Sequence, residues 1–125
     1  MYAGREVSAT LSANTISGNV ATSASDATGA GGGLYATGST YLALLDNTIS
    51  GNKAATAASA EGNGGGIHNF DGQTTVDSST ISGNQATRRG GGVASLVFNG
   101  RADIEIEGST IADNQATIGG SGLIA

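Results

Sequence analysis

The chain of 125 residues contains 22 glycines and no proline, cysteine or tryptophan, and only 12% of its residues are charged, with a net charge of −5. This length predicts one domain, residues 1–125, and the 38% of hydrophobic residues, many of them alanine, exclude both a disordered acidic tail and a core of large aromatic side chains. The negative charge disfavours nucleic acid, whose binding needs a clustered basic surface, and no stretch approaches the roughly 18 apolar residues of a membrane span.

A six-residue motif recurs four times along the chain. Three copies read Asn/Ser-Thr-Ile-Ser-Gly-Asn, and the last reads Ser-Thr-Ile-Ala-Asp-Asn. The motif isoleucines are Ile16, Ile49, Ile81 and Ile111, so that the repeat is 33, then 32, then 30 residues long. A repeat of this length is typical of a solenoid, in which each repeat forms one coil.

Each repeat predicts three strands in a fixed order. Residues alternate between apolar and polar in a segment that ends four residues before each isoleucine, at 8–12, 41–45, 73–77 and 103–107. The Thr-Ile-Ser segment predicts a shorter strand, and the aliphatic residues after each glycine cluster, such as Leu34–Ala36, predict a third. Helices are not expected, because Gly, Ser, Thr and Asn dominate the sequence.

Two columns of identical residues follow if the coils stack in parallel about 4.8 Å apart. The motif isoleucines would form a column in the core. The asparagines three residues after them would form a hydrogen-bonded ladder at a corner, since an amide carries both donor and acceptor; they are Asn19, Asn52, Asn84 and Asn114. The fold predicted is therefore all-β, a right-handed parallel β-helix (β-solenoid) of about four coils with no evident caps.

The pattern Gly-Gly-Gly-aliphatic followed by Thr-Ile-Ser-Gly-Asn resembles the right-handed parallel β-helix repeats of the pectin-lyase-like superfamily. It is most similar to the repeats of polymorphic outer membrane proteins and other secreted adhesins, and the resemblance covers nearly the whole chain. It implies a secreted or cell-surface location, with which the lack of cysteine is compatible, and glycans or a cell surface as partners. The superfamily also includes polysaccharide lyases and hydrolases, so the fold alone does not decide the function.

Carboxylates gather on one predicted outward face. Asp77 and Glu107 occupy the same position in adjacent coils, and Glu105 and Asp103 lie on the same face, with Arg101 as a candidate basic partner. Paired carboxylates about 5 Å apart could serve a retaining glycosidase, and several oxygens could bind a cation. The simpler interpretation is a solvated strand. The residues that act in the superfamily's lyases and hydrolases have no match here, and the single histidine, His68, is expected at the surface or at a corner.

A second outward face carries hydroxyl groups at regular intervals. If isoleucine points inward, the threonine and serine on either side point outward; these are Thr15/Ser17, Thr48/Ser50, Thr80/Ser82 and Thr110 with Ala112. This grid resembles the Thr-x-Thr faces of ice-binding β-solenoids. The alternative is an ordinary solvated strand face, in which threonine is common.

Loops and ends are where the repeats differ. Segments 22–30 and 55–63 are predicted as long loops and possible contact surfaces, and a smaller insertion is predicted near 98–101. Neither end carries an evident capping segment. The first and the last residues each form part of a repeat, and the two parts together would make one complete coil. The chain is therefore expected to be either an excerpt of a longer array or a subunit that stacks head to tail into a filament.

These observations favour a non-catalytic extracellular structural or adhesion protein, with no catalytic residues, cofactor or metal assigned. A carbohydrate-active enzyme fragment resting on Asp77, Glu105 and Glu107 is the alternative from another class, and ice binding is the second alternative.

Overall fold

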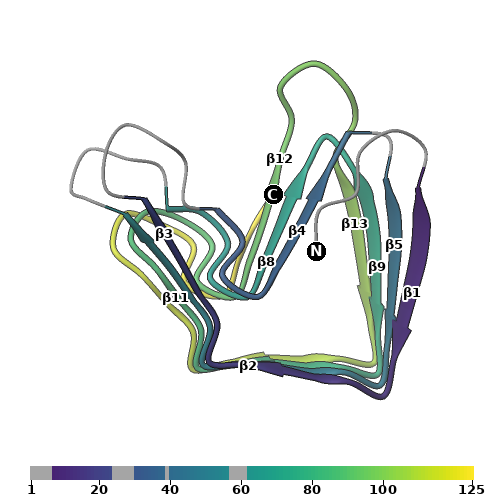
Figure 1. Cartoon of the computed structure of the whole chain (residues 1–125), viewed down its shortest axis with the longest axis horizontal. Helices are drawn as coiled ribbons and strands as arrows, with labels where there is room; N and C mark the ends of the chain where they lie inside the picture. Colours follow the sequence, from purple (N-terminus) through teal and green to yellow (C-terminus); the bar gives the residue numbers. More distant parts are fainter. Residues whose placement is uncertain (1–6, 24–29, 39, 57–61) are drawn as a thin grey trace.

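The computed structural model describes residues 7–23, 30–38, 40–56 and 62–125, and these residues form an all-β parallel solenoid (Figure 1). Sixteen strands make four sheets of four strands each, and every pairing between neighbouring strands is parallel. The described residues contain no helix, and so no helix that could cross a membrane.

The four sheets, here named A to D, appear in the same order in every coil. Sheet A contains β1 (Ser8–Ser12), β5 (Tyr41–Leu45), β9 (Gln73–Asp77) and β13 (Asp103–Glu107). Sheet B contains β2 (Thr15–Ser17), β6 (Thr48–Ser50), β10 (Thr80–Ser82) and β14 (Thr110–Ala112). Sheet C contains β3 (Val20–Ser23), β7 (Lys53–Thr56), β11 (Gln85–Ala86) and β15 (Gln115–Ala116). Sheet D contains β4 (Leu34–Thr37), β8 (Ile67–Phe70), β12 (Val93–Leu96) and β16 (Leu123–Ile124).

The solenoid is right-handed. In Figure 1 the chain passes from β1 along β2 to β3 in a clockwise sense while later coils recede from the viewer. The chain enters each sheet four times, so that about three turns separate the first strand of a sheet from the last. The pairing register matches residues at equivalent repeat positions, for example Ile16 with Ile49. The predicted all-β solenoid is therefore confirmed.

Sheet C was not predicted. It follows the motif asparagine directly, and its inward residues are the alanines Ala21, Ala54, Ala86 and Ala116, which pair in register. Alanine is a weak signal for a strand, and β11 and β15 contain only two residues each. The long loops predicted at 22–30 and 55–63 begin later than expected, because β3 continues to Ser23 and β7 to Thr56; residues 24–29 and 57–61 lie outside the described part of the chain.

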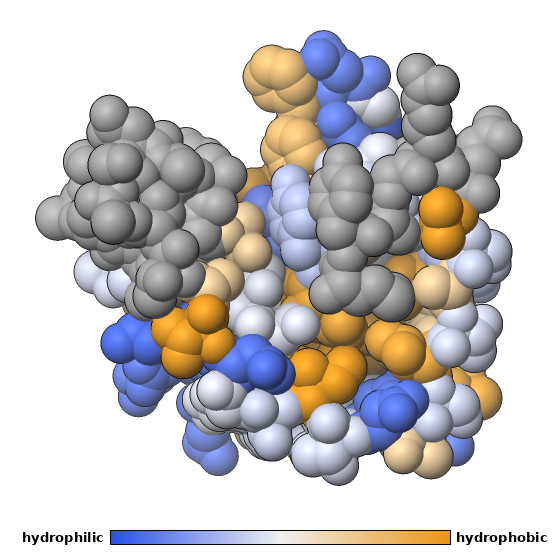
Figure 2. Space-filling view, in the orientation of Figure 1, coloured by the Kyte–Doolittle hydropathy of each residue, from blue (hydrophilic) through white to orange (hydrophobic). Residues whose placement is uncertain are grey.

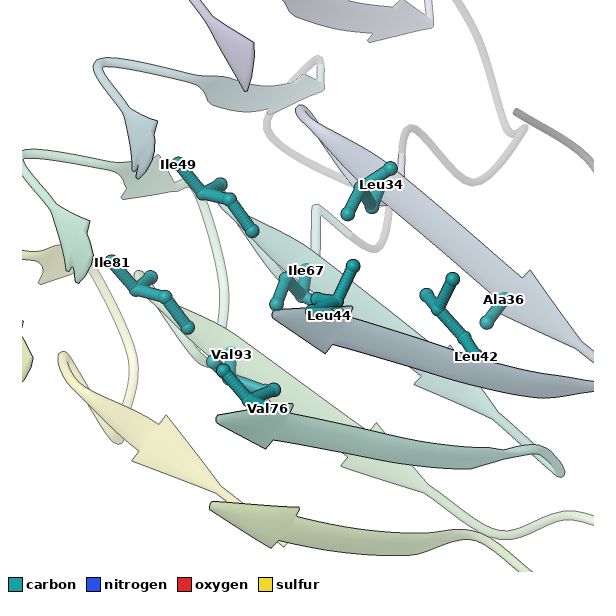
Figure 3. Packing of buried hydrophobic residues seen from close by; sticks show 9 residues of the cluster. All are labelled: Leu34, Ala36, Leu42, Leu44, Ile49, Ile67, Val76, Ile81 and Val93. Atoms are coloured by element: carbon teal, nitrogen blue, oxygen red, sulfur yellow. The ribbon is translucent and has the colours of Figure 1, made fainter. Parts of the chain in front are cut away.

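The core is a set of aliphatic columns enclosed by sheets A, B and D. Ile49 and Ile81 lie one above the other, as do Leu44 and Val76, and the sheet D residues Leu34, Ile67 and Val93 face them (Figure 3). The central residues Ile49, Ile67, Ile81 and Val93 are fully buried. Ile16 and Ile111, in the first and last coils, are only half-buried and complete the isoleucine column at its two ends.

The glycine clusters exist because of close packing between coils. A Cβ on Gly65 would lie 2.3 Å from the carbonyl oxygen of Gly91 and 2.4 Å from that of Gln85. Gly32 and Gly91, at the same repeat position, are equally crowded by backbone atoms. The first glycine of each cluster has a positive φ, 67° at Gly64 for example, a conformation that glycine adopts without steric cost.

Candidate functional site

The motif asparagines form a continuous ladder at the corner between sheets B and C. The side-chain oxygen of Asn84 accepts from the backbone N–H of Asn52 at 2.9 Å and from its amide at 3.0 Å. The Asn84 amide in turn donates to the carbonyl of Ile49 at 2.9 Å and to the side-chain oxygen of Asn114 at 2.9 Å. The same pattern joins Asn19 to Asn52. The side chains of Asn52 and Asn84 therefore use their donors and acceptors within the solenoid.

The last glycine of the first three clusters, Gly33, Gly66 and Gly92, leaves room for this ladder. A Cβ on Gly66 would lie 3.1 Å from the amide nitrogen of Asn84, and one on Gly92 would lie 2.9 Å from that of Asn114. The glycine cluster and the motif asparagine therefore pack against each other in the interior of the stack.

A second ladder occupies the corner between sheets A and B, and the sequence did not predict it. The backbone N–H of Asn14 donates to the side-chain oxygen of Asn47 at 2.9 Å, and the N–H of Asn47 donates to the hydroxyl of Ser79 at 3.0 Å. The Ser79 N–H continues the series to the Ser109 hydroxyl at 3.0 Å. The available signal was the first motif position, which is Asn or Ser in every repeat.

The predicted hydroxyl face lies on the outside of sheet B. Thr15, Thr48, Thr80 and Thr110 pair in register across β2, β6, β10 and β14, and all four are exposed. In the adjacent column Ser17 is exposed, whereas Ser50, Ser82 and Ala112 are half-buried.

The predicted carboxylate positions are also in register. Glu107 pairs with Asp77, and Asp103 pairs with Gln73. The Asp77 side chain accepts a hydrogen bond from the Ser78 hydroxyl at 2.8 Å, and Arg101 forms an ion pair with Asp103 at 2.5 Å. Within the described residues, no three His, Asp or Glu side chains gather as they would around a metal ion.

His68 is buried rather than exposed, contrary to the expectation from sequence. It lies in the middle of β8, with 5% of its surface accessible, between the rings of Tyr35 at 5.2 Å and Phe70 at 5.8 Å. Phe98, from the loop that follows β12, stacks on Phe70 at 6.2 Å. The rings of Tyr35, His68, Phe70 and Phe98 thus contact one another in series from sheet D to this loop.

Residues 97–101 form the insertion predicted near 98–101, and the carboxylate of Asp71 holds this loop in place. The backbone N–H groups of Phe98, Asn99 and Gly100 donate to that carboxylate at 2.7, 3.1 and 3.2 Å. These bonds, the one from Phe98 above all, lower the pKa of Asp71 from its ordinary value of 3.8. Asp71 has a φ of 57°, which directs the turn after β8. No sequence pattern connects Asp71 with a loop 27 residues away.

The first prediction concerns the hydrogen bonds that Phe98, Asn99 and Gly100 donate to Asp71, here called the Asp71 latch. Because the folded-state pKa of Asp71 is lowered, its stabilising effect is present above pH 3.8 and is lost as the pH falls through the lower folded-state value. In an NMR titration, the amide resonances of Phe98, Asn99 and Gly100 should therefore move together below pH 3.8. Asp71→Asn should abolish this shared transition at the three amides, whereas Asp113→Asn, on another corner, should leave it intact. Independent movement of the three amides would contradict the latch.

Two shallow depressions lie on sheet A, and one of them adjoins the loop at 97–101. One, of about 260 Å³, lies between the loop and the starts of β5 and β9 and is lined in part by Tyr41, Asp71, Gln73 and Arg101. The other, of about 250 Å³, continues along sheet A and shares Tyr41 and Gln73 with the first. The two depressions, which share these two residues, are here together called the sheet A groove.

Comparison with protein-family models, curated proteins and solved structures found no match to this chain. The class of protein that the fold defines is a parallel β-solenoid repeat protein.

Proposed function

We propose that this protein is a non-catalytic structural or adhesion β-solenoid of the cell surface or the secreted space, with repeats related to those of the pectin-lyase-like superfamily. The observation that carries the proposal is the pair of corner ladders. The polar side chains that recur in the repeat, Asn52 and Asn84 among them, are buried and hydrogen-bonded along the stack. Such an arrangement stiffens a rod and leaves these side chains unavailable for chemistry.

The asparagine ladder has a direction, and this direction supports head-to-tail stacking. In each step, an asparagine donates from its backbone N–H and its amide to the side-chain oxygen of the next coil. At the face formed by β1–β4, the corresponding oxygen belongs to Asn19; at the face formed by β13–β16, the corresponding donors belong to Asn114. Those groups are complementary only when unlike faces meet, which is the heterologous contact that builds filaments.

The core also continues to both end faces. Figure 2 views the β1–β4 face, where hydrophobic atoms are visible between the sheets; Ala9, Leu11 and Ile16 are the partly buried residues of this coil. Ile104, Ile106 and Ile111 are their counterparts in the last coil. A further coil, whether from a longer chain or a second copy, would bury these side chains.

Ser121 opposes a close fit at one corner. It stands at the middle position of the glycine cluster, where a Cβ on Gly91 would lie 2.3 Å from the carbonyl oxygen of Gln115 in the following coil. A copy stacked in the same register would therefore meet the Ser121 side chain with its own backbone. Head-to-tail association of the chain as it stands is accordingly expected to be weak.

The second prediction tests this assembly. Sedimentation velocity over a range of protein concentrations should show weak association for the unchanged protein, stronger association for Ser121→Gly and none for Asn19→Lys. Asn19 and Ser121 are exposed, so both variants should fold. Filaments in electron micrographs of Ser121→Gly would support the proposal further. If the sedimentation of all three proteins is that of a monomer at every concentration, end-to-end stacking is wrong.

A further inference from the structure

We propose that the loop at 97–101 is a peripheral membrane anchor, which places Val97 and Phe98 in the interface of a bilayer of neutral lipids. These two neighbouring side chains are 62% and 73% exposed, and Phe98 is the most exposed large hydrophobic residue in the part of the chain that the structure describes. Neither belongs to the aliphatic core. In Figure 1 the loop rises above the corner between β12 and β13, so its apolar atoms lie on a projection of the molecule.

The loop is an insertion in one coil. In the preceding coil, the chain passes from β8, which ends at Phe70, to β9, which begins at Gln73; in this coil it passes from Leu96 of β12 to Asp103 of β13. The longer connection contributes no strand to any sheet. Turns are normally built from Gly, Asn, Asp, Ser and Pro, so the corner itself does not require a valine followed by a phenylalanine.

The exposed side chains belong to one apolar patch. Leu96, which precedes Val97, is half-buried and pairs in register with Phe70. The ring of Phe98 stacks on that of Phe70 at 6.2 Å. Exposed hydrophobic residues that occur singly need no explanation, whereas a patch of them indicates an interaction site. Four apolar residues at one corner, with Phe98 the most exposed, therefore indicate a partner outside the chain.

The backbone of the loop is prepared for an apolar medium. An N–H group that leaves water for the acyl region of a bilayer finds no partner there, and this opposes insertion of irregular backbone. In the Asp71 latch, the N–H groups of Phe98, Asn99 and Gly100 already donate to one carboxylate, at 2.7, 3.1 and 3.2 Å. The latch also holds the loop in one conformation, which lowers the entropy lost on binding.

The size and shape of the loop favour a lipid surface over a second protein. A stable protein interface buries about 800 Å² on each partner, whereas one buried aromatic side chain supplies only about 150–250 Å². A protein partner would also need a cavity complementary to the projection. A bilayer interface adapts to such a projection and accepts apolar side chains to a depth of about 5–10 Å.

The charges favour neutral lipids over anionic ones. The whole chain has a net charge of −5. Arg101, the cation of the loop, forms an ion pair with Asp103, and the Asp71 carboxylate adds a further negative charge beside the loop. Attraction to anionic lipid requires a cluster of basic residues, which this corner lacks among its described residues. Binding is therefore expected to depend on the apolar side chains and to change little with salt.

The test is flotation of the protein with phosphatidylcholine vesicles. Two side chains bury less apolar surface than a myristoyl chain, whose binding constant is about 10⁴ M⁻¹, so half of the protein should float at about millimolar lipid. Phe98→Ser should lower the binding constant about tenfold. Ile118→Ser is the matched control and should leave it unchanged, because Ile118 is 65% exposed but follows β15, outside the loop.

Phe98→Trp provides a second measurement, because the chain contains no other tryptophan. Its fluorescence emission should move to shorter wavelength when phosphatidylcholine vesicles are added, as the indole leaves water for the interface. Without vesicles, the emission should stay the same at every protein concentration. Replacing part of the phosphatidylcholine by phosphatidylserine should not strengthen binding.

Three results would overturn the proposal: neither flotation nor an emission shift up to roughly 10 mM lipid, equal binding of Phe98→Ser and the unchanged protein, or binding only to vesicles that contain anionic lipid. An emission shift that follows protein concentration without lipid would also overturn it and would identify a second copy as the partner. This inference names a lipid surface for the proposed scaffold and can fail separately from it. A monomer that binds vesicles would remove the stacking proposal alone, and a filament that binds none would remove this one alone.

Discussion

Gly65→Ala is expected to destabilise the solenoid by more than ~3 kcal/mol, because the new methyl group has no space. Its Cβ would lie within 2.6 Å of three backbone atoms, one from Gly91 and two from Gln85. Backbone atoms inside a stack cannot move without separating the coils, unlike the end of a flexible side chain. Small domains are stable by roughly 5–15 kcal/mol in total, so the variant should lose a large share of its stability in thermal or urea unfolding.

Gly51→Ala separates this steric effect from backbone strain. Gly51 lies in the same coil with a φ of 62°, and a Cβ there would meet no atom within 4 Å. Only the strain of the left-handed conformation remains, which is about 1–2 kcal/mol. Equal losses in the two variants would show that conformational freedom, rather than close packing, explains the glycine clusters.

Much of the fold could be predicted from sequence because it repeats. The strands at 8–12, 41–45, 73–77 and 103–107 follow from their alternation of apolar and polar residues and coincide with sheet A. Repetition also revealed the asparagine and isoleucine columns, since the same residue at the same position in each coil implies stacking. Sheet C escaped prediction because two of its four strands contain only two residues and alanine is its only inward signal.

The features that occur once could not be predicted in the same way. The Asp71 latch joins a left-handed turn to a loop 27 residues later, through three backbone N–H groups that any sequence would supply. His68 looked like a surface residue because its partners, Tyr35 and Phe70, become neighbours only after β4 and β8 pair. The groove requires Tyr41 and Gln73 to lie side by side, which depends on the register of sheet A. Local function, in a repeat protein, therefore depends on the positions where one coil departs from the others.

Asn84→Ala is expected to cost about 3–5 kcal/mol, since burying an unsatisfied donor or acceptor costs about 1–3 kcal/mol for each group. Asn84 is fully buried. Without its side chain, the backbone N–H of Asn52, one amide hydrogen of Asn52 and the carbonyl of Ile49 lose their partners. These groups are buried in the stack, so the loss should appear in the free energy of unfolding.

Asn19→Ala is the matched control for Asn84→Ala. Asn19 belongs to the same ladder but is exposed, and its removal leaves the backbone N–H at position 19 still able to donate to Asn52. The expected loss is below ~1 kcal/mol, that of a single solvent-accessible hydrogen bond. A large difference between the two variants would mean that the ladder stabilises the stack through buried groups that depend on one another. Equal small losses would mean that the aliphatic columns alone hold the coils together, and the proposed role of the ladder as the stiffening element of the rod would have to be abandoned.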